Sequence, residues 1–245
     1  MIPDLSRRSG ERERMDGEDV DFETFQGCLR DLARVNALSG GYRPTLAFLD
    51  GLRRAGRLAL GRPVEILDAG SGHGDALRAV DRWAARRGIP VRLLGVDLNP
   101  WSARAAAEAT GEGRPIRWET GDLFDHEGGA DVVVSSLFAH HLDDARVVRF
   151  VAWMEERARV GWFVNDLHRH LLPALGFGPL AAMLGMHRFV RHDGPASFRR
   201  AFKPGDWRRL LAEAGLPPGA AEVRRFAPFR LCVGRIKPAW RATSW

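Results

Sequence analysis

The segment from Val64 to Asp75 constrains this chain more than any other part of it. An apolar run and an acid are followed by glycines at alternate positions, Gly70, Gly72 and Gly74, and then by a helical pattern. A strand that turns into a helix through such glycines lets main-chain N–H groups approach a ligand, because glycine lacks a Cβ and tolerates positive φ. The pattern therefore predicts a strand–loop–helix unit that binds a nucleotide-type cofactor.

The glycine spacing differs from that of dinucleotide-binding proteins. In their G-x-G-x-x-G fingerprint the third glycine lies three residues after the second, and a pyrophosphate sits at the start of the helix. Here the order is G-x-G-x-G, and Asp75 stands where that third glycine would be. This departure disfavours a nicotinamide or flavin dinucleotide.

Two further elements follow in order along the chain. The apolar run from Val91 ends in Asp97, about 25 residues after the loop, close to the roughly 20-residue spacing of a ribose-binding acid. A carboxylate at this place can accept hydrogen bonds from both ribose hydroxyls. A second acid, Asp122, follows the predicted strand 116–120 after one glycine, Gly121.

Together these elements resemble the cofactor motifs of class I S-adenosylmethionine-dependent methyltransferases, over about residues 22 to 236. The resemblance implies that Asp68 and the three glycines surround the methionine portion of S-adenosyl-L-methionine. It also implies that Asp97 binds the ribose, and that Asp122 meets the adenine amino group while its neighbour packs the ring. The predicted cofactor contacts are Asp68, Gly70, Gly72, Gly74, Asp97, Leu98, Asp122, Leu123 and Ser135.

Strand-like and helical patterns alternate through the middle of the chain, which indicates a parallel sheet covered by helices on both faces. Two final strands are joined too tightly at Ala227-Pro228 for a crossover helix, so they form a hairpin. We expect an α/β, doubly wound, Rossmann-like sheet of seven strands, mostly parallel with an antiparallel last strand. The expected strands are 64–68, 92–97, 116–120, 131–136, 160–165, 221–228 and 230–236, and the main helices are 75–87, 101–110, 143–158 and 205–214.

The division of the chain follows from composition and periodicity. Residues 1–18 are rich in charge without apolar periodicity, which predicts a mobile tail. The remainder, 19–245, is expected to be one methyltransferase domain. Within it we expect N-terminal helices over 19–60, which by resemblance lie over the cofactor, and a helical cap insertion at 167–204.

Bulk properties exclude several functional classes. The net charge is +6, but nearly all of the 37 basic residues are arginines scattered among acids, so we expect a solvated surface and no nucleic-acid partner. The two cysteines, Cys28 and Cys232, are too few for a metal site or a disulfide framework. With no leader peptide and no apolar run of about 18 residues, a cytoplasmic enzyme is expected.

The cap insertion contains an uncharged run, Leu171 to Met186. Such a run indicates one of two structures. It is either a helix buried against the domain, or an apolar wall or entrance for an apolar aromatic substrate, in which case the segment touches a membrane surface. Both interpretations stay open at this point. The candidate substrate contacts are Phe138, His168, His170 and Phe177.

Histidines gather at two predicted strand ends. His140 and His141 follow the fourth strand, and Asp166, His168 and His170 follow the fifth. Ligands of open α/β sheets lie outside the carboxyl ends of the strands, and histidine is a workable base near neutral pH. We predict that His140 or His141, helped by Asp166, removes a proton from a hydroxyl group.

The string from His140 to Leu142 also resembles the small-molecule branch of the family, which includes ubiquinone and menaquinone biosynthesis methyltransferases and natural-product O-methyltransferases. This likeness implies O-methylation of a small, phenolic, secondary metabolite. C-methylation of a phenol or quinol ring is the main alternative, and a protein that binds the cofactor without catalysis is a weaker one.

Three other methyltransferase types fit the sequence less well. Amino-methylating nucleic-acid enzymes need an Asn/Asp/Ser-Pro-Pro-aromatic turn, where this chain has Ser135-Ser136-Leu137-Phe138. Cytosine C5 enzymes place a nucleophilic cysteine in that region, whereas the cysteines of this chain, Cys28 and Cys232, lie elsewhere. Asn165 and Asp166 offer oxygen ligands for magnesium, but the fourth strand ends in serines, so no metal is predicted.

Overall fold

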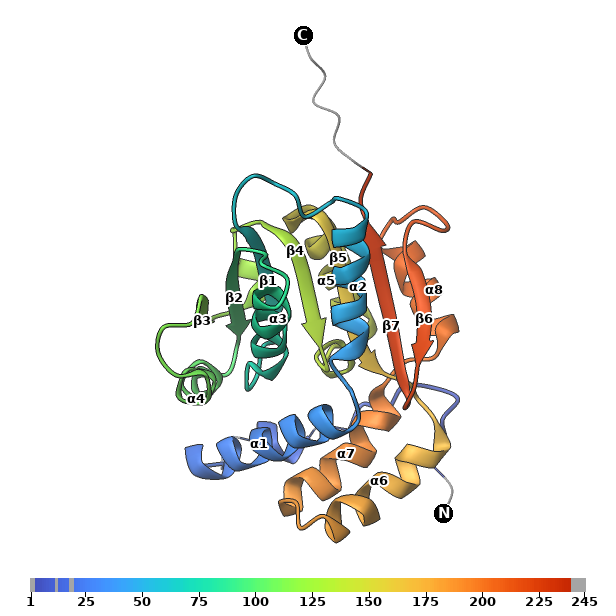
Figure 1. Ribbon diagram of the computed structural model, residues 1–245. Helices are drawn as coiled ribbons and strands as arrows, with labels where there is room; N and C mark the ends of the chain where they lie inside the picture. Colours follow the sequence, from blue (N-terminus) through green and yellow to red (C-terminus); the bar gives the residue numbers. More distant parts are fainter. Residues whose placement is uncertain (1–2, 12, 18–19, 239–245) are drawn as a thin grey trace.

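A computed structural model describes residues 3–11, 13–17 and 20–238 of the chain (Figure 1). Parts of the expected tail (1–2, 12 and 18) and of the expected domain (19 and 239–245) lie outside the described residues.

The described residues contain a sheet of seven strands in the order β3-β2-β1-β4-β5-β7-β6. β7 runs antiparallel to both β5 and β6, whereas the other neighbouring pairs are parallel. The expected seven-stranded, mostly parallel sheet is confirmed, and so is its terminal hairpin. The strands are β1 (Val64–Ala69), β2 (Val91–Asp97), β3 (Ile116–Thr120), β4 (Ala130–Ser136), β5 (Ala158–Leu167), β6 (Glu222–Phe226) and β7 (Arg230–Ile236).

The central strands are apolar almost throughout, because helices cover both faces of the sheet. In β4 every residue except the last is buried. One core lies between the sheet and the helices α2 and α3, and a second lies on the opposite face with α5 and α8. The helices that flank the sheet are α2 (Arg43–Arg54), α3 (Asp75–Ala85), α4 (Pro100–Thr110), α5 (Asp144–Arg157) and α8 (Pro204–Glu213), with short 3-10 turns at Arg14–Asp16, Leu123–Asp125 and Ala139–His141.

Three further helices, α1 (Phe22–Leu38), α6 (Leu171–Met183) and α7 (Arg188–Arg200), lie together beyond the carboxyl ends of the parallel strands (Figure 1). They share an apolar cluster that includes Phe25 of α1, Ala181 of α6 and Val190 of α7. The cap insertion is thus helical, as expected, and with α1 it forms a layer over the end of the sheet where the histidines cluster.

The N-terminal segment differs from the expected mobile tail. Residues 3–11 and 13–17, which we name the N-terminal strap, lie against the domain. Met15 is buried in the cluster of the helical layer, and the guanidinium of Arg8 stacks 4.1 Å from the ring centre of Phe202. The absence of apolar periodicity suggested mobility, but the strap is held mainly by charged side chains that find partners on the domain.

Candidate active site

The glycine loop is held between two aromatic rings. A Cβ on Gly70 would lie 2.3 Å from the ring of Phe138, and one on Gly74 would lie 2.1 Å from the ring of Trp118. Both glycines also have positive φ angles, 73° and 71°. Close approach and backbone conformation therefore both require glycine at these two positions.

The middle glycine has a different environment. A Cβ on Gly72 would meet only Leu29 of α1, at 3.9 Å, so this part of the loop is open toward the helical layer. The main-chain N–H of Gly72 donates to Asp97 Oδ2 at 2.8 Å, and the N–H of Asn99 donates to Asp97 Oδ1 at 2.9 Å. The loop thereby fixes the carboxylate at the end of β2.

Asp68, at the end of β1, has a buried carboxyl oxygen without a hydrogen-bond partner in the described part of the chain. The residue is 1% exposed, and Oδ1 has no hydrogen-bond partner among the described residues. Burial, and then the nearby charges of Asp75 and Asp97, hold the pKa of its carboxyl well above the usual range. A buried carboxyl without a hydrogen-bond partner, close to the carboxylates of Asp75 and Asp97, favours binding of a cationic group and disfavours binding of a pyrophosphate.

Asp75 also ties the N-terminal helices to the loop. Its Oδ2 accepts hydrogen bonds from Tyr42 Oη at 2.8 Å and from Asn36 Nδ2 at 3.1 Å. Burial, and then the negative charge of Asp75, raise the pKa of Tyr42. The first residue of α3 therefore positions α1 over the glycine loop.

The remaining predicted cofactor contacts lie in varied environments. Asp122 is exposed and accepts the main-chain N–H two residues further on at 2.9 Å, while Leu123 is buried. Leu98 is 71% exposed beside the end of β2. Ser135 is buried, and its Oγ donates at 2.8 Å to the carbonyl of the last residue of β1. Ser135 thus joins two strands beneath the loop.

The ends of β4 and β5 bring His140 and Asp166 together. His140 Nδ1 lies 2.7 Å from Asp166 Oδ1, and the main-chain N–H of His140 donates to Asp166 Oδ2 at 3.0 Å. Both side chains are buried. The carboxylate therefore fixes the orientation of the imidazole ring, as the sequence led us to expect.

A third charged residue, Glu13 of the strap, completes this cluster. Its Oε1 lies 3.5 Å from His140 Nε2 and 3.8 Å from His141 Nε2, and it accepts a hydrogen bond from Ser197 Oγ at 2.6 Å. Sequence reasoning missed Glu13. Its neighbours form a run of charged residues, and no spacing distinguishes it from a solvated acid.

The cluster is an ion triad. Burial disfavours the charged form of His140, but the charge and hydrogen bond of Asp166, followed by those of Glu13, raise its pKa to about 9. Burial also opposes ionisation of Glu13, yet its electrostatic interaction with His141, its contacts with His140 and the hydrogen bond from Ser197 lower its pKa to about 2. At neutral pH His140 is therefore an imidazolium between two carboxylates.

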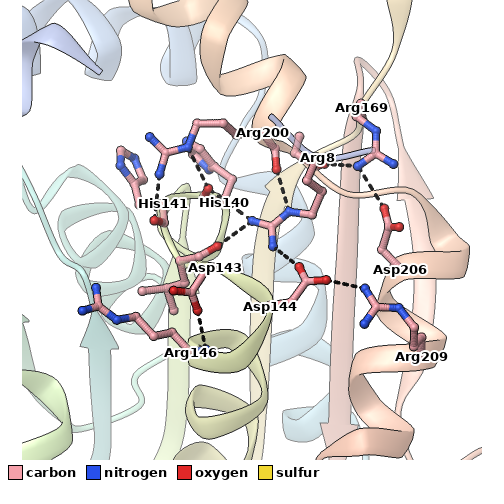
Figure 2. Close-up of polar contacts among 12 residues, drawn as sticks. Arg8, His140, His141, Asp143, Asp144, Arg146, Arg169, Arg200, Asp206 and Arg209 are labelled. Atoms are coloured by element: carbon pink, nitrogen blue, oxygen red, sulfur yellow. Dashed lines mark hydrogen bonds and ion pairs between the residues drawn. The ribbon is translucent and has the colours of Figure 1, made fainter. Parts of the chain in front are cut away.

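Two arginines bind main-chain carbonyls of the short 3-10 turn Ala139–His141 and of Leu142, a segment that we name the histidine turn (Figure 2). Arg200 of α7 donates to the carbonyls of His140 and His141 at 3.2 and 2.7 Å. Arg8 of the strap donates to the carbonyls of His140 and Leu142 at 3.3 and 2.7 Å. These guanidinium groups satisfy carbonyls that the short 3-10 turn leaves unpaired, so the position of both imidazoles depends on the strap and on the cap.

The comparisons with known proteins decide the type of enzyme. Residues 66–161, which span β1 to the first part of β5, match the family model described as "Methyltransferase domain". The strand order and the cofactor motifs agree with that match. The chain contains an S-adenosylmethionine-dependent methyltransferase domain. No curated protein matches the sequence.

Solved structures share the fold of this methyltransferase at low sequence identity. Magnesium protoporphyrin IX methyltransferase from Synechocystis PCC 6803, with bound SAH, is 15% identical, covers 92% of this chain and 91% of its own, and has a TM-score of 0.54. The plantazolicin methyltransferase BpumL, in complex with a desmethylPZN analog and SAH, is 13% identical over 85% and 89%, with a TM-score of 0.59. Human N-acetylserotonin methyltransferase is 15% identical over 89% of this chain and 56% of its own, with a TM-score of 0.61.

The residues of the loop suit the cofactor of this enzyme class. S-adenosyl-L-methionine carries a sulfonium and an ammonium group, and the unpaired carboxyl of Asp68 faces no competing cation in the described part of the chain. Asp97 is fixed at the end of β2 by the N–H groups of Gly72 and Asn99. Asp68, the glycine loop and Asp97 are therefore the residues that would hold the cofactor.

Glu13, His140 and His141 of the methyltransferase also lie close enough to share a metal ion. Their ligand atoms fall within 4.8 Å of one another, and no other group within the described ranges meets this criterion. The three residues already satisfy one another as an ion cluster, and Ser197 donates to the same oxygen of Glu13. The prediction of a metal-free site stays a prediction, which chelation tests below.

The other candidate substrate residues of the methyltransferase do not join this cluster. His168 and His170 form their own pair, with ring centres 5.9 Å apart, and His170 Nδ1 caps α6 by accepting the N–H of Leu172 at 3.2 Å. Phe138 covers Gly70, as described above. Phe177 of α6 packs against α7 and lines an apolar groove between α1 and α6.

Proposed function

We propose that this methyltransferase methylates a hydroxyl group of a small, aromatic, largely apolar metabolite, and that a histidine of the histidine turn accepts the hydroxyl proton. The observation that carries the proposal is the pairing of His140 with Asp166 at the carboxyl ends of β4 and β5, beside the glycine loop. Parallel α/β sheets place ligands at this edge.

The two histidines have different roles in this proposal. His140 holds a proton at neutral pH, since both of its ring nitrogens face carboxylates. His141 is the more accessible of the two, with 28% of its side chain exposed, and it is the proposed proton acceptor. Glu13 stabilises the imidazolium that His141 becomes, and Asp166 and His140 hold the turn in place.

The proposed reaction is an in-line displacement. When bound, the cofactor supplies an activated methyl group on sulfur. The imidazole of His141 takes the proton of the substrate hydroxyl, and the cofactor held by Asp68, the glycine loop and Asp97 would supply the methyl group that replaces it. The chain contributes mainly alignment and removal of this proton.

An apolar acceptor is supported by the composition of the helical layer. The groove between α1 and α6 is lined by seven apolar side chains and one serine, and Phe177 is among them. The solved neighbours are named for small-molecule substrates, a protoporphyrin, plantazolicin and N-acetylserotonin. Both observations favour a small organic substrate, of the kind found in secondary metabolism.

Methylation at carbon is the second candidate. If the acceptor is a phenol or quinol, loss of the same proton produces a phenolate whose ring carbon can attack instead. A mass-spectrometric screen of phenolic lipids and polyketides with isotopically labelled cofactor would locate the added methyl group on oxygen or carbon.

The role of the histidines is tested by His141→Ala, His140→Ala and the double variant. Loss of a general base lowers turnover by about 10²-fold or more, while the affinity for S-adenosylmethionine stays unchanged. His126→Ala, on the β3–β4 connection, is the matched control and should keep full activity. Near-normal turnover in all three variants would contradict the proposal.

The same assay with excess chelator addresses the metal alternative. We expect unchanged turnover, because the proposed chemistry needs only an imidazole. Loss of activity that returns on adding one divalent metal would instead make Glu13, His140 and His141 metal ligands.

A further inference from the structure

The outward face of α6 has no polar side chain. Leu172, Leu175, Leu180 and Met183 are all exposed, Met183 by 85% and Leu172 by 66%. A surface helix normally turns charged or polar residues toward water. This helix buries three small residues, Pro173, Ala174 and Ala181, and half-buries Phe177, while its leucines and methionine are exposed.

The apolar surface continues beyond α6. Leu184, just after the helix, and Leu38, at the end of α1, are also exposed. Between α1 and α6 lies a groove of about 250 Å³, lined by Leu38, Leu180, Leu184 and other apolar side chains. The exposed face and the groove therefore form one continuous apolar surface, which we name the α6 face.

Basic residues accompany the α6 face. The cap insertion 167–204 contains six arginines and lysines and one acid, Asp193, which is buried. Three of the six are engaged elsewhere: Arg169 is buried against Asp206, Arg199 pairs with Glu11, and Arg200 binds carbonyls of the histidine turn. Arg188 and Arg191, in the first turn of α7, are exposed. On the neighbouring α1, Arg34 is largely exposed and lies 3.7 Å from Asp31, so its charge is compensated. Positive charge beside the apolar surface therefore comes from Arg188 and Arg191.

We propose that the α6 face docks on the surface of an anionic lipid bilayer, with α6 lying in the plane of the interface. Apolar side chains on one helix face with arginines beside them are typical of interfacial helices. Each basic residue near an anionic surface adds favourable energy, whereas a second copy of this chain would bring the same positive charges together. Within the described residues no helix has the length and apolar character to cross a membrane, so the contact is peripheral.

The test is co-sedimentation of the full-length chain with vesicles. We expect binding to vesicles of phosphatidylcholine with phosphatidylglycerol, weaker binding to pure phosphatidylcholine, and loss of binding at high salt. The double variant Leu175→Glu/Met183→Glu should bind about tenfold or more weakly. Ile236→Glu, an exposed apolar residue at the end of β7, is the matched control and should bind like the wild type.

Two sedimentation results would overturn the proposal. In the first, the wild type stays in solution with both kinds of vesicle, and in the second, it binds both kinds equally. It could also form a dimer in solution that Leu175→Glu/Met183→Glu abolishes, which would assign the α6 face to a second copy of the chain. Affinity for S-adenosylmethionine, measured on every variant, verifies folding, and because no acceptor substrate is used, the result is independent of the proposed methylation.

Discussion

At the scale of single residues, two buried carboxyls of the site have opposite roles. Asp166 is fully satisfied by the ring and main chain of His140, and burial is outweighed by these contacts so that its pKa is lowered. Asp68 is equally buried but has one oxygen without a partner. A satisfied carboxylate organises its neighbours, whereas an unsatisfied one is prepared for a ligand.

This contrast leads to a prediction for Asp68→Asn. The substitution removes a charge-assisted contact to the cofactor, so affinity for S-adenosylmethionine should fall about 10- to 100-fold by calorimetry. The free energy of unfolding should stay equal or rise, because an unpaired buried charge site is removed. Asp50→Asn, on the surface of α2, is the control.

An unchanged affinity in Asp68→Asn would show that this carboxyl does not face the cofactor. Lower affinity together with clear destabilisation would instead indicate a structural role, so the two measurements separate the interpretations.

At the scale of elements, the candidate active site is assembled from parts that are far apart in the sequence. The strap contributes Arg8 and Glu13, β4 leads into the histidine turn, β5 contributes Asp166, and α7 contributes Arg200. The strap also extends its contacts to α5, where Arg8 Nη1 lies 2.6 Å from Asp144 Oδ1. The strap is thus a structural component of the site.

We therefore expect Arg8→Ala to affect catalysis more than cofactor binding. The variant loses hydrogen bonds to two carbonyls of the histidine turn and the ion pair with Asp144, so turnover should fall about tenfold and stability by about 1–3 kcal/mol. Affinity for S-adenosylmethionine should not change, since the glycine loop is untouched. Steady-state kinetics and calorimetry give both values.

Arg7→Ala is the matched control, because Arg7 is the exposed neighbour of Arg8. If both variants behave like the wild type, the strap does not support the histidine turn in solution.

The elements themselves were largely predictable from sequence. Strands such as 116–120 and helices such as 75–87 agree with the structure to within one or two residues, because apolar periodicity and glycine turns mark their ends. The strap was not predictable. Arg8 and Glu13 are fixed by partners more than 100 residues away, and a local pattern carries no information about such contacts.

The pairing of strand ends was the part of the site that sequence could anticipate. Parallel strands end at one edge, so His140 and Asp166 were expected to lie close together. The contact of the His140 ring with two carboxylates could not be predicted from sequence, because the second carboxylate, that of Glu13, belongs to the strap. The same limit applies to His170, whose position at the start of α6 makes it a helix cap.

At the scale of the whole molecule, the ion triad links stability to pH. The pKa of His140 is about 9 in the folded protein, compared with about 6.5 for an unperturbed histidine. A raised pKa stabilises the folded state fully below about pH 6.5, and this contribution is lost as the pH rises through about 9. The triad is therefore most effective at neutral and mildly acidic pH.

Urea unfolding between pH 6 and pH 10 measures this effect. The wild type should lose about 1–3 kcal/mol more stability over this range than His140→Gln, which cannot titrate at this position. Equal slopes for the two proteins would mean that His140 is not held as an imidazolium. The comparison with the variant cancels contributions from other titrating groups.

The strap residues that contact the histidine turn and the rest of the site lie on opposite sides of Met15 in the sequence. Arg8 and Glu13 both precede Met15, whereas the glycine loop, the sheet and the histidines all follow it. A shortened chain that begins at Met15 would retain the residues proposed to recognise the sulfonium nucleoside but lose the two amino-terminal side chains that contact the histidine turn. We expect the chain from residue 1 to bind S-adenosylmethionine and turn over, and the shortened chain chiefly to bind.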